Sequence, residues 1–385
     1  MSAFTRTITL HQLRNLAFGA GCAGQCAADL IARGTRSVFV VTAAPVVKLG
    51  ESLFAGLRRG GCEVTVWPNV GGEPGIRDFE SALSDARDAR ADAIVGLGGG
   101  SAMDVAKLVA AFLDGSQDLR DAFGVGRLRG RATHLVCLPT TAGTGSEASP
   151  IAILLDEADE LKKGVVSPHL VPDAAYVDPL LTVSVPPAVT AATGIDALTH
   201  CIEAFANRFA HPVVDNYAIE GIRLISRNLL RVVENGADIE ARTQVALGSL
   251  YGGLCLGPVN TAAIHALSYP LGGEFHIAHG VANALLMTHV LEFNLPAAPA
   301  RYAEVAIALG AERGRDDMET AQRGLERLRE LSRRCGLPSR LREFGIDESA
   351  IDRMARAAMT VQRLLERNLR TVTEQDARAI YRAAL

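Results

Sequence analysis

Short apolar runs alternate with longer amphipathic segments in the first half of the chain. The runs that predict buried strands lie at residues 37–42, 63–67, 93–97 and 134–138, and residues 176–178 predict a last short strand. Between them, apolar positions recur at helical spacing in residues 47–59 and 76–89. Because strands alternate with helices, we predict an α/β fold in which helices cover both faces of a parallel sheet.

The pattern changes near residues 183–187, where the strand-like runs cease. Helical spacing then dominates, in residues 188–206, 215–233, 239–255, 318–335 and 374–383. A chain of 385 residues is also too long for one ordinary core. We therefore predict two domains, an α/β domain over residues 1–184 and an all-helical domain over residues 185–385.

Composition and charge narrow the class of protein. A hydrophobic content of 48% with 21% charged residues is typical of a soluble globular protein. The net charge of -4 comes without a basic stripe, which argues against a nucleic-acid partner. Apolar windows such as residues 93–113 carry charged residues, here Asp104 and Lys107, so we expect neither a transmembrane helix nor a membrane partner.

The cysteines and the first residues bear on localisation. Seven cysteines are odd in number and scattered, which is typical of buried reduced thiols rather than of a disulfide framework. Residues 1–10 show no apolar run behind Arg6, so we expect no signal peptide. Both observations predict a cytoplasmic protein.

Glycines follow the predicted strand at residues 93–97. Gly98, Gly99, Gly100 and Ser101 lead into a segment with helical spacing, and we expect Ser101 to be the N-cap of that helix. Exposed backbone N–H groups at a helix N-terminus favour a phosphate. The run matches neither the dinucleotide fingerprint nor a P-loop, so a tight turn without a ligand is the alternative interpretation.

A second glycine-broken loop follows the predicted strand at residues 134–138. Residues 139–147 contain four hydroxyl side chains, those of Thr140, Thr141, Thr144 and Ser146, and two glycines. This composition suits the ribose and phosphates of a nucleotide. Two such loops at the carboxyl ends of neighbouring strands predict the crevice in which open sheets bind ligands.

Histidines gather in one apolar segment of the second half. His265, His276 and His279 lie within fifteen residues, and upstream Asp196 and His200 are four apart on one face of a predicted helix. One carboxylate and three imidazoles form a ligand set that fits Fe(II) or Zn(II). A hydrogen-bonded core network is the alternative interpretation of these residues.

Helix-breaking residues separate two of these histidines. Pro270, Gly272 and Gly273 lie between His265 and His279, so we expect His265 at a helix end and His279 at the start of the following segment.

Together, these motifs resemble the iron-containing (group III) alcohol dehydrogenase family. The resemblance rests on residues 98–107, 139–147, 194–200 and 265–283, which occur in the right order and cover essentially the whole length. It implies a Rossmann-like domain followed by a helical domain, a dehydroquinate-synthase-like architecture, with NAD(P) and a metal in the cleft between the domains.

The resemblance also implies roles for individual residues. The metal ligands would be Asp196, His200, His265 and His279. The cofactor-binding residues would be Gly98, Gly99, Gly100 and Ser101 at the pyrophosphate, together with Asp104, Thr140, Thr141, Thr144, Ser149, Lys162 and His279. Lys163 is an alternative to its neighbour Lys162.

The expected reaction links a small alcohol or aldehyde to NAD or NADP. The metal, Fe(II) with Zn(II) as the alternative, would act as a Lewis acid on the substrate oxygen while hydride passes to or from nicotinamide C4. The apolar ligand region favours a small alcohol or aldehyde; its residues are Ala262, Ala263, Ala266, Leu267, Phe275 and Ile277. Family habit implies a homodimer or higher homo-oligomer.

The chain departs from the family pattern at two positions. Many relatives have a histidine where this chain has Tyr269, and we expect Tyr269 or His276 to take over its catalytic role in proton relay. NAD-preferring relatives often have an aspartate after a Val-Thr pair, where this chain continues Thr42-Ala43-Ala44. Without that carboxylate, we predict that NADPH is tolerated.

Other functions remain open on the residues alone. A dehydroquinate-synthase-like cyclase would need several basic side chains for a phosphate, and the apolar ligand region does not favour it. Maleylacetate reductases and glycerol-dehydrogenase-like enzymes usually lack this full ligand set. A nucleotide-sensing protein without activity would bind metal and cofactor but would show no turnover.

Overall fold

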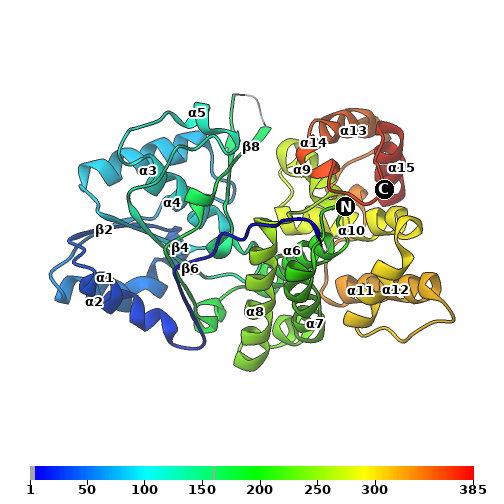
Figure 1. Ribbon diagram of the computed structural model, residues 1–385, viewed down its shortest axis with the longest axis horizontal. Helices are drawn as coiled ribbons and strands as arrows, with labels where there is room; N and C mark the ends of the chain where they lie inside the picture. Colours follow the sequence, from blue (N-terminus) through cyan, green and yellow to red (C-terminus); the bar gives the residue numbers. More distant parts are fainter. Residues whose placement is uncertain (1–4, 159–160) are drawn as a thin grey trace. The chain divides into compact units, whose positions relative to one another are not determined.

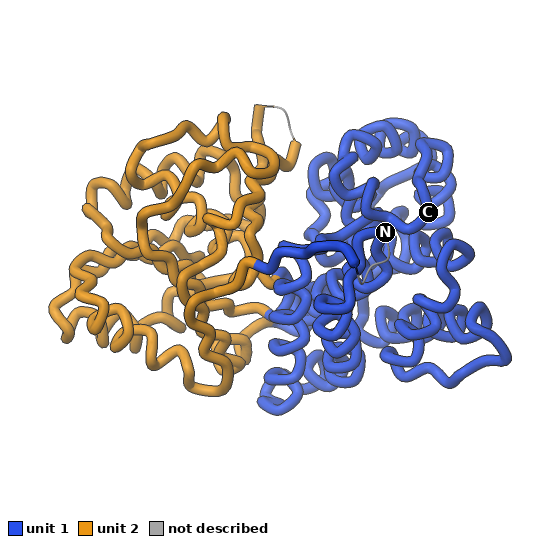
Figure 2. Tube along the Cα trace, viewed as in Figure 1, with its two compact units in different colours: residues 1–10, 142–144, 186–385 blue, residues 11–141, 145–185 orange. Residues whose placement is uncertain are grey.

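The computed structural model describes residues 5–158 and 161–385 (Figure 1). The described residues form two compact units (Figure 2). The strand-containing unit comprises the described residues of 11–141 and 145–185, and the helical unit comprises residues 5–10, 142–144 and 186–385. The predicted domain boundary between residues 184 and 185 stays a prediction. It places residues 142–144 in the α/β domain, whereas in the structure they group with the helical unit.

A six-stranded parallel sheet is the centre of the strand-containing unit. Its strands run in the order β1-β9-β6-β4-β2-β3. The bounds are β1 Asn15–Phe18, β2 Ser37–Val41, β3 Glu63–Trp67, β4 Ala93–Gly98, β6 His134–Pro139 and β9 Ala174–Val177. The helices are α1 Gln25–Ala32, α2 Glu51–Arg59, α3 Ile76–Asp88, α4 Gly100–Phe112 and α5 Leu119–Ala122. The predicted α/β fold class is confirmed.

Helices cover both faces of this sheet. In β2, Val38 and Val40 pack with the apolar side chains of α1 and α2, whereas Phe39 and Val41 pack with those of α3 and α4. Both sets are buried because alternate residues of a strand point to opposite faces and each face has a helical cover. This explains why central strands of this sheet appear as continuous apolar runs.

The edges of the sheet differ from the prediction. β3 was expected to be buried, but it is an edge strand in which only Trp67 is buried. The other edge strand, β1, spans only four residues and was not predicted. A strand with one uncovered side needs less apolar sequence, which makes such strands harder to recognise.

A small second sheet was also not predicted. It has the order β5-β8-β7, with bounds β5 Gly124–Val125, β8 Leu161–Val166 and β7 Ile151–Asp156. β7 pairs antiparallel with β8 directly after the second glycine-broken loop. The segment that follows the loop therefore forms a strand, β7, of this second sheet.

Each helix predicted for the second half of the chain has a counterpart in the helical unit, which also contains helices that were not predicted. Its helices are α6 Pro187–Phe205, α7 Pro212–Glu234, α8 Ile239–Leu256, α9 Ala263–Phe275, α10 His279–Asn294, α11 Pro299–Ala308, α12 Asp317–Arg334, α13 Ile351–Met359, α14 Gln362–Leu365 and α15 Glu374–Ala384. Their buried faces form one large apolar core. Among the described residues, no helix is both long and apolar enough to cross a membrane. All seven cysteines are free and buried.

Pro270 does not end a helix, contrary to the prediction. It lies inside α9, which continues to Phe275. An internal proline costs about 3 kcal/mol in an isolated helix, but Pro270 and most residues of this helix are buried in the core. His265 is therefore in the first turn of α9 rather than at its end.

Candidate functional site

Helix α6 carries the first two candidate ligands. Asp196 and His200 are four residues apart, so both side chains project from one face of the helix. Most of α6 from Thr190 onward is buried, including both of these polar residues. A buried carboxylate and imidazole on an apolar helix require polar partners.

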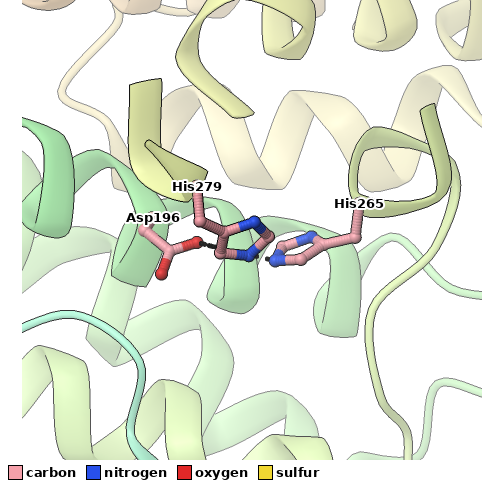
Figure 3. Close-up of side chains that lie close together, drawn as sticks. All are labelled: Asp196, His265 and His279. Carbon is pink, nitrogen blue, oxygen red and sulfur yellow. Dashed lines mark ion pairs between the residues drawn. The ribbon is translucent and has the colours of Figure 1, made fainter. Parts of the chain in front are cut away.

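Helices α9 and α10 bring two further histidines to the same place. His265 lies in the first turn of α9, and His279 is the first residue of α10, as the sequence pattern predicted for His279. Together with Asp196, they offer ligand atoms that all lie within 4.8 Å of one another (Figure 3). Asp196 and His265 are buried, whereas the side chain of His279 is 32% exposed.

One oxygen of Asp196 faces the Nε2 atoms of three histidines. Its Oδ1 lies 3.6 Å from His200, 3.5 Å from His265 and 3.7 Å from His279. Ligands about 2.1 Å from a tetrahedral ion lie about 3.4 Å apart. These separations fit a divalent ion. His200 is outside the set of three but stacks on His265, with ring centroids 4.8 Å apart.

Asn283, one turn after His279, also faces this set. Its Nδ2 lies 2.7 Å from Asp196 Oδ1, 3.2 Å from His265 Nε2 and 3.3 Å from His279 Nε2. An amide nitrogen has two hydrogens and cannot satisfy three acceptors at once. Asn283 Oδ1 is buried without a hydrogen-bond partner among the described residues. This excess of acceptors fits a cation.

The electrostatics also favour a cation here. Burial raises the pKa of the Asp196 carboxyl, but the surrounding histidines outweigh burial and hold it well below its usual range. Burial lowers the pKa of the His265 ring, but the Glu203 and Asp196 carboxylates raise it to about 9. Burial lowers the pKa of His200, against the effect of Asp196. Positive charge is thus stabilised beside His265, as a proton or as a metal ion.

Sequence reasoning missed Glu203. Its Oε2 lies 2.6 Å from His265 Nδ1, on the side of the ring opposite Asp196. The signal was present, because Glu203 follows His200 by three residues and is a charged residue within a buried apolar helix. Only the tertiary structure shows which side chain it contacts.

The two candidates for proton relay lie in different surroundings. The Tyr269 ring is partly buried, with its centroid 6.4 Å from that of His279. His276 follows the last residue of α9, has a left-handed backbone conformation and is exposed.

The glycine run joins β4 to α4, as predicted, but Ser101 is not the N-cap. The helix begins at Gly100 with Gly99 as N-cap, and the Ser101 hydroxyl donates to the backbone oxygen of Gly72 at 2.9 Å. A Cβ on Gly98 would lie 2.7 Å from the Cβ of Ala102, so the turn needs glycine there. The backbone at the start of α4 has no capping side chain of its own.

The second loop lies beside this turn, as expected. The Thr140 backbone N–H donates to the Gly98 oxygen at 2.9 Å, and a Cβ on Gly99 would lie 3.4 Å from Thr141 Oγ1. Thr144 belongs to residues 142–144, which are part of the helical unit. Thr140, through its backbone, and Thr141, through its hydroxyl, therefore adjoin the glycine turn within one unit.

Two further candidates are held by interior contacts. Asp104 accepts hydrogen bonds from the Ser146 hydroxyl at 2.6 Å and from the Ile153 N–H at 3.0 Å. Ser149 is buried, and its Oγ lies 3.3 Å from the ammonium of Lys107. These contacts fix the shape of the second loop.

Lys162 and Lys163 both form ion pairs on β8. Lys162 Nζ lies 2.6 Å from Glu73, and Lys163 Nζ lies 2.7 Å from Asp156. The side chain of Lys162 is 12% exposed, compared with 31% for Lys163.

The apolar residues of the ligand region do not form a substrate surface. Those predicted to favour a small substrate are nearly all buried in the core of the helical unit: Ala262, Ala263, Ala266, Leu267 and Ile277. Only Phe275 is partly exposed. Ala263, Ala266, Leu267 and Ile277 belong to the apolar core of this unit.

Comparisons with known proteins agree with these observations. Residues 14–179 match the family described as iron-containing alcohol dehydrogenase, and residues 190–385 match the C-terminal part of the same family. A long-chain-alcohol dehydrogenase from Geobacillus thermodenitrificans is 41% identical, over 95% of this chain and 94% of its own.

Solved structures share the fold. A 1,3-propanediol oxidoreductase has a TM-score of 0.95 at 32% identity and covers 99% of this chain and 100% of its own. A sulfoacetaldehyde reductase from Bifidobacterium kashiwanohense in complex with NAD+ has a TM-score of 0.89 at 28% identity, covering 98% and 99%. The predicted dehydroquinate-synthase-like architecture is confirmed, and the chain belongs to the iron-containing alcohol dehydrogenase family.

Proposed function

We propose that this chain is an iron-dependent alcohol dehydrogenase that interconverts primary alcohols and aldehydes with NAD(P). The observation that carries the proposal is the set of Asp196, His265 and His279, whose ligand atoms lie within 4.8 Å of one another. Both Fe(II) and Zn(II) accept this ligand set, so the ligands alone do not select the metal. Membership of the iron-containing family supports Fe(II).

Four side chains would hold the metal. Asp196 supplies the carboxylate, and His265 and His279 supply two imidazoles. His200 supplies the third imidazole, since its Nε2 lies 3.6 Å from the same Asp196 oxygen. When bound, the ion supplies a Lewis acid for the substrate oxygen. The partial exposure of His279 makes it the ligand nearest to solvent.

The turn at Gly98–Ser101 would bind the cofactor pyrophosphate. Backbone N–H groups at the start of the thirteen-residue α4 have no capping side chain, and Thr140 and Thr141 lie beside the turn. The NAD+ complex of a structural relative supports a nicotinamide cofactor.

We propose that NADPH is also used. The residues after β2 are Thr42 and Ala43, followed by the turn Ala44–Gly50, which contains no carboxylate and carries the exposed Lys48. A 2′-phosphate would meet no repulsion there. Measured kcat/KM values should differ by less than a hundredfold between NADH and NADPH. The Ala43→Asp variant should shift the preference towards NADH; a wild-type preference for NADH above a hundredfold would contradict the proposal.

We propose Tyr269 as the proton-relay group, with His276 as the alternative. The Tyr269 ring is close to His279 and partly buried, whereas His276 is exposed. Tyr269→Phe should lower kcat and change its pH profile. If Tyr269→Phe and His276→Ala both keep the turnover and pH profile of the wild type, neither side chain is the relay.

The proposed substrates are aliphatic alcohols and the corresponding aldehydes. The 41% identical relative is named for long-chain alcohols, which supports unbranched aliphatic substrates for this chain.

We also propose a homodimer, supported by the exposed Val189, Phe209 and Val213 of the helical unit. Light scattering on the purified protein would test it.

The decisive experiment is a turnover assay with the Fe(II)-loaded, anaerobically purified protein. NADH and NADPH oxidation would be followed with aldehydes from one to twelve carbons and with hydroxy- and carboxy-aldehydes. We expect metal-dependent turnover that is lost in His265→Ala and kept in His289→Gln, a change of another α10 histidine outside the ligand set. Metal and nucleotide binding without turnover on any aldehyde would contradict the proposal.

A further inference from the structure

Glu203 contacts two groups at the start of α9 through its two carboxylate oxygens. Oε2 lies 2.6 Å from Nδ1 of His265, and Oε1 accepts a hydrogen bond from the Ile264 backbone N–H, also at 2.6 Å. The Glu203 side chain is only 4% exposed. Each oxygen of this buried carboxylate is therefore held by a hydrogen bond to a residue of α9.

The contact with Ile264 supplies a missing helix cap. The N-cap residue of α9 is Ala262, which has no side-chain acceptor for the N–H groups of the first turn. Glu203, from α6, provides the acceptor instead. The same carboxylate therefore fixes the start of the helix and the ring of its third residue.

The contact with His265 determines where the ring carries its proton. A carboxylate only accepts hydrogen bonds, so Nδ1 must donate. In the neutral imidazole, Nε2 then keeps its lone pair, and Nε2 is the atom that lies 3.5 Å from Asp196 Oδ1. Carboxylates that bind the outer nitrogen of a metal-ligating histidine fix both its tautomer and its orientation.

We propose that Glu203 is a positioning residue for the metal, which it serves by holding the His265 ring with Nε2 directed at the ligand set. The inference rests on the proposed metal site and adds a residue that contacts neither metal nor substrate. Glu203 acts through one hydrogen bond, and its second oxygen anchors it to the backbone of the same helix.

Glu203→Gln tests this role with almost no change in size. The amide oxygen can still accept from Ile264, but the –NH2 group then faces Nδ1 and donates to it, which moves the ring proton to Nε2. We expect the dissociation constant for Co(II), used as a spectroscopic probe, to rise about 10–100-fold. Circular dichroism and the unfolding midpoint of the metal-free protein should stay close to the wild type.

Two comparisons separate positioning from a general structural effect. Asp215→Asn changes another acid of the helical unit, one that pairs with Arg301 at 2.5 Å, and should leave Co(II) affinity unchanged. In the His265→Ala background, Glu203→Gln should cause no further loss, because the ring through which it acts is absent.

The outcomes are distinct. Wild-type protein that binds no Co(II) would overturn the proposed function and this inference with it. Co(II) affinity of Glu203→Gln within twofold of the wild type would overturn this inference alone. The same holds if Glu203→Gln lowers the Co(II) affinity of His265→Ala as much as it lowers that of the wild type. If the variant does not fold, NMR of the 15N-histidine-labelled, Zn(II)-loaded wild type decides: we expect a proton on Nδ1 of His265, and its absence would overturn the proposal.

Discussion

Lys107 is a charged residue in the interior of the strand-containing unit. Its side chain is fully buried, and its ammonium donates to the backbone oxygens of Ser149 and Ile151, both at 2.9 Å. Burial lowers the pKa of Lys107, while the nearby Asp104 raises it. A buried ammonium is stable only among acceptors, so Lys107 ties α4 to the segment after the second loop.

We predict that Lys107→Met destabilises the protein by about 3 kcal/mol, because it keeps the volume but leaves two buried carbonyls without a donor. The dissociation constant for NADH should also rise, since the loop is no longer anchored. Urea unfolding and fluorescence titration would measure the two effects. Lys48→Met, at an exposed position, is the control; equal stability of both variants would refute the prediction.

At the scale of elements, the packing of α10 against α6 sets the distance between two ligands. Gly280 follows His279 in the first turn of α10, and a Cβ there would lie 2.2 Å from the backbone oxygen of Ala192 on α6. Backbone atoms in a packed core cannot give way as a flexible side chain can. Gly280 therefore permits the approach that brings His279 to Asp196.

We predict that Gly280→Ala lowers stability by about 1–3 kcal/mol through overpacking and weakens metal binding at least tenfold, because the start of α10 must move. Thermal unfolding and Co(II) titration would check this. Gly130→Ala is the matched control, since nothing lies within 4 Å of a Cβ at that position. Unchanged Co(II) affinity in Gly280→Ala would contradict the prediction that close packing of α10 on α6 positions His279.

A second element-scale contact joins β6 to the start of β9. Asp173 Oδ2 lies 2.6 Å from Arg131 Nη1 and 3.3 Å from His134 Nδ1, and it accepts from the Leu135 N–H at 3.0 Å. Burial raises the pKa of Asp173, but these donors outweigh burial and hold it well below its usual range. The ionised form is therefore stabilised in the folded state.

This shift predicts an acid-sensitive contribution to stability. The folded pKa of Asp173 is lowered, so its contribution is fully present above the ordinary aspartate pKa of about 3.9 and is lost as the pH falls towards the folded value. Asp173→Asn should be less stable than the wild type at pH 7, and the difference should shrink below about pH 4. Urea unfolding at both pH values would measure it; a constant difference would contradict the assignment.

At the scale of the whole molecule, the candidate ligand sets lie in different compact units. Asp196, His200, His265 and His279 all belong to the helical unit, whereas Gly98–Ser101 belong to the strand-containing unit. Each unit has apolar core of its own. A ligand stabilises the folded state that binds it. The gain is about 2.7 kcal/mol when the ligand concentration is a hundred times the dissociation constant.

We predict that metal and nucleotide protect separate segments from hydrogen exchange. Co(II) should slow exchange in α6, α9 and α10, and NAD+ should slow it at the start of α4. His265→Ala should weaken the effect of Co(II) and keep that of NAD+. Protection of α4 by Co(II) alone, without slowing in α9, would show that the metal binds elsewhere.

Local patterns in the sequence determined most elements of both units. Apolar periodicity placed the strand at 134–138 and the helix at 239–255 within a residue of β6 and α8, because burial of one or two faces imposes that periodicity directly. The four-residue spacing of Asp196 and His200 likewise fixes their shared face, since helix geometry is local.

Only the tertiary structure decided the contacts between distant segments. The helix through Pro270 is held by the core around it, and Ser101 bonds to Gly72 rather than capping its own helix. Glu203 and His265 are 62 residues apart, and no local pattern predicts that they meet. Such pairs depend on how whole helices pack, which is set by the summed burial of many side chains and not by the residues that finally touch.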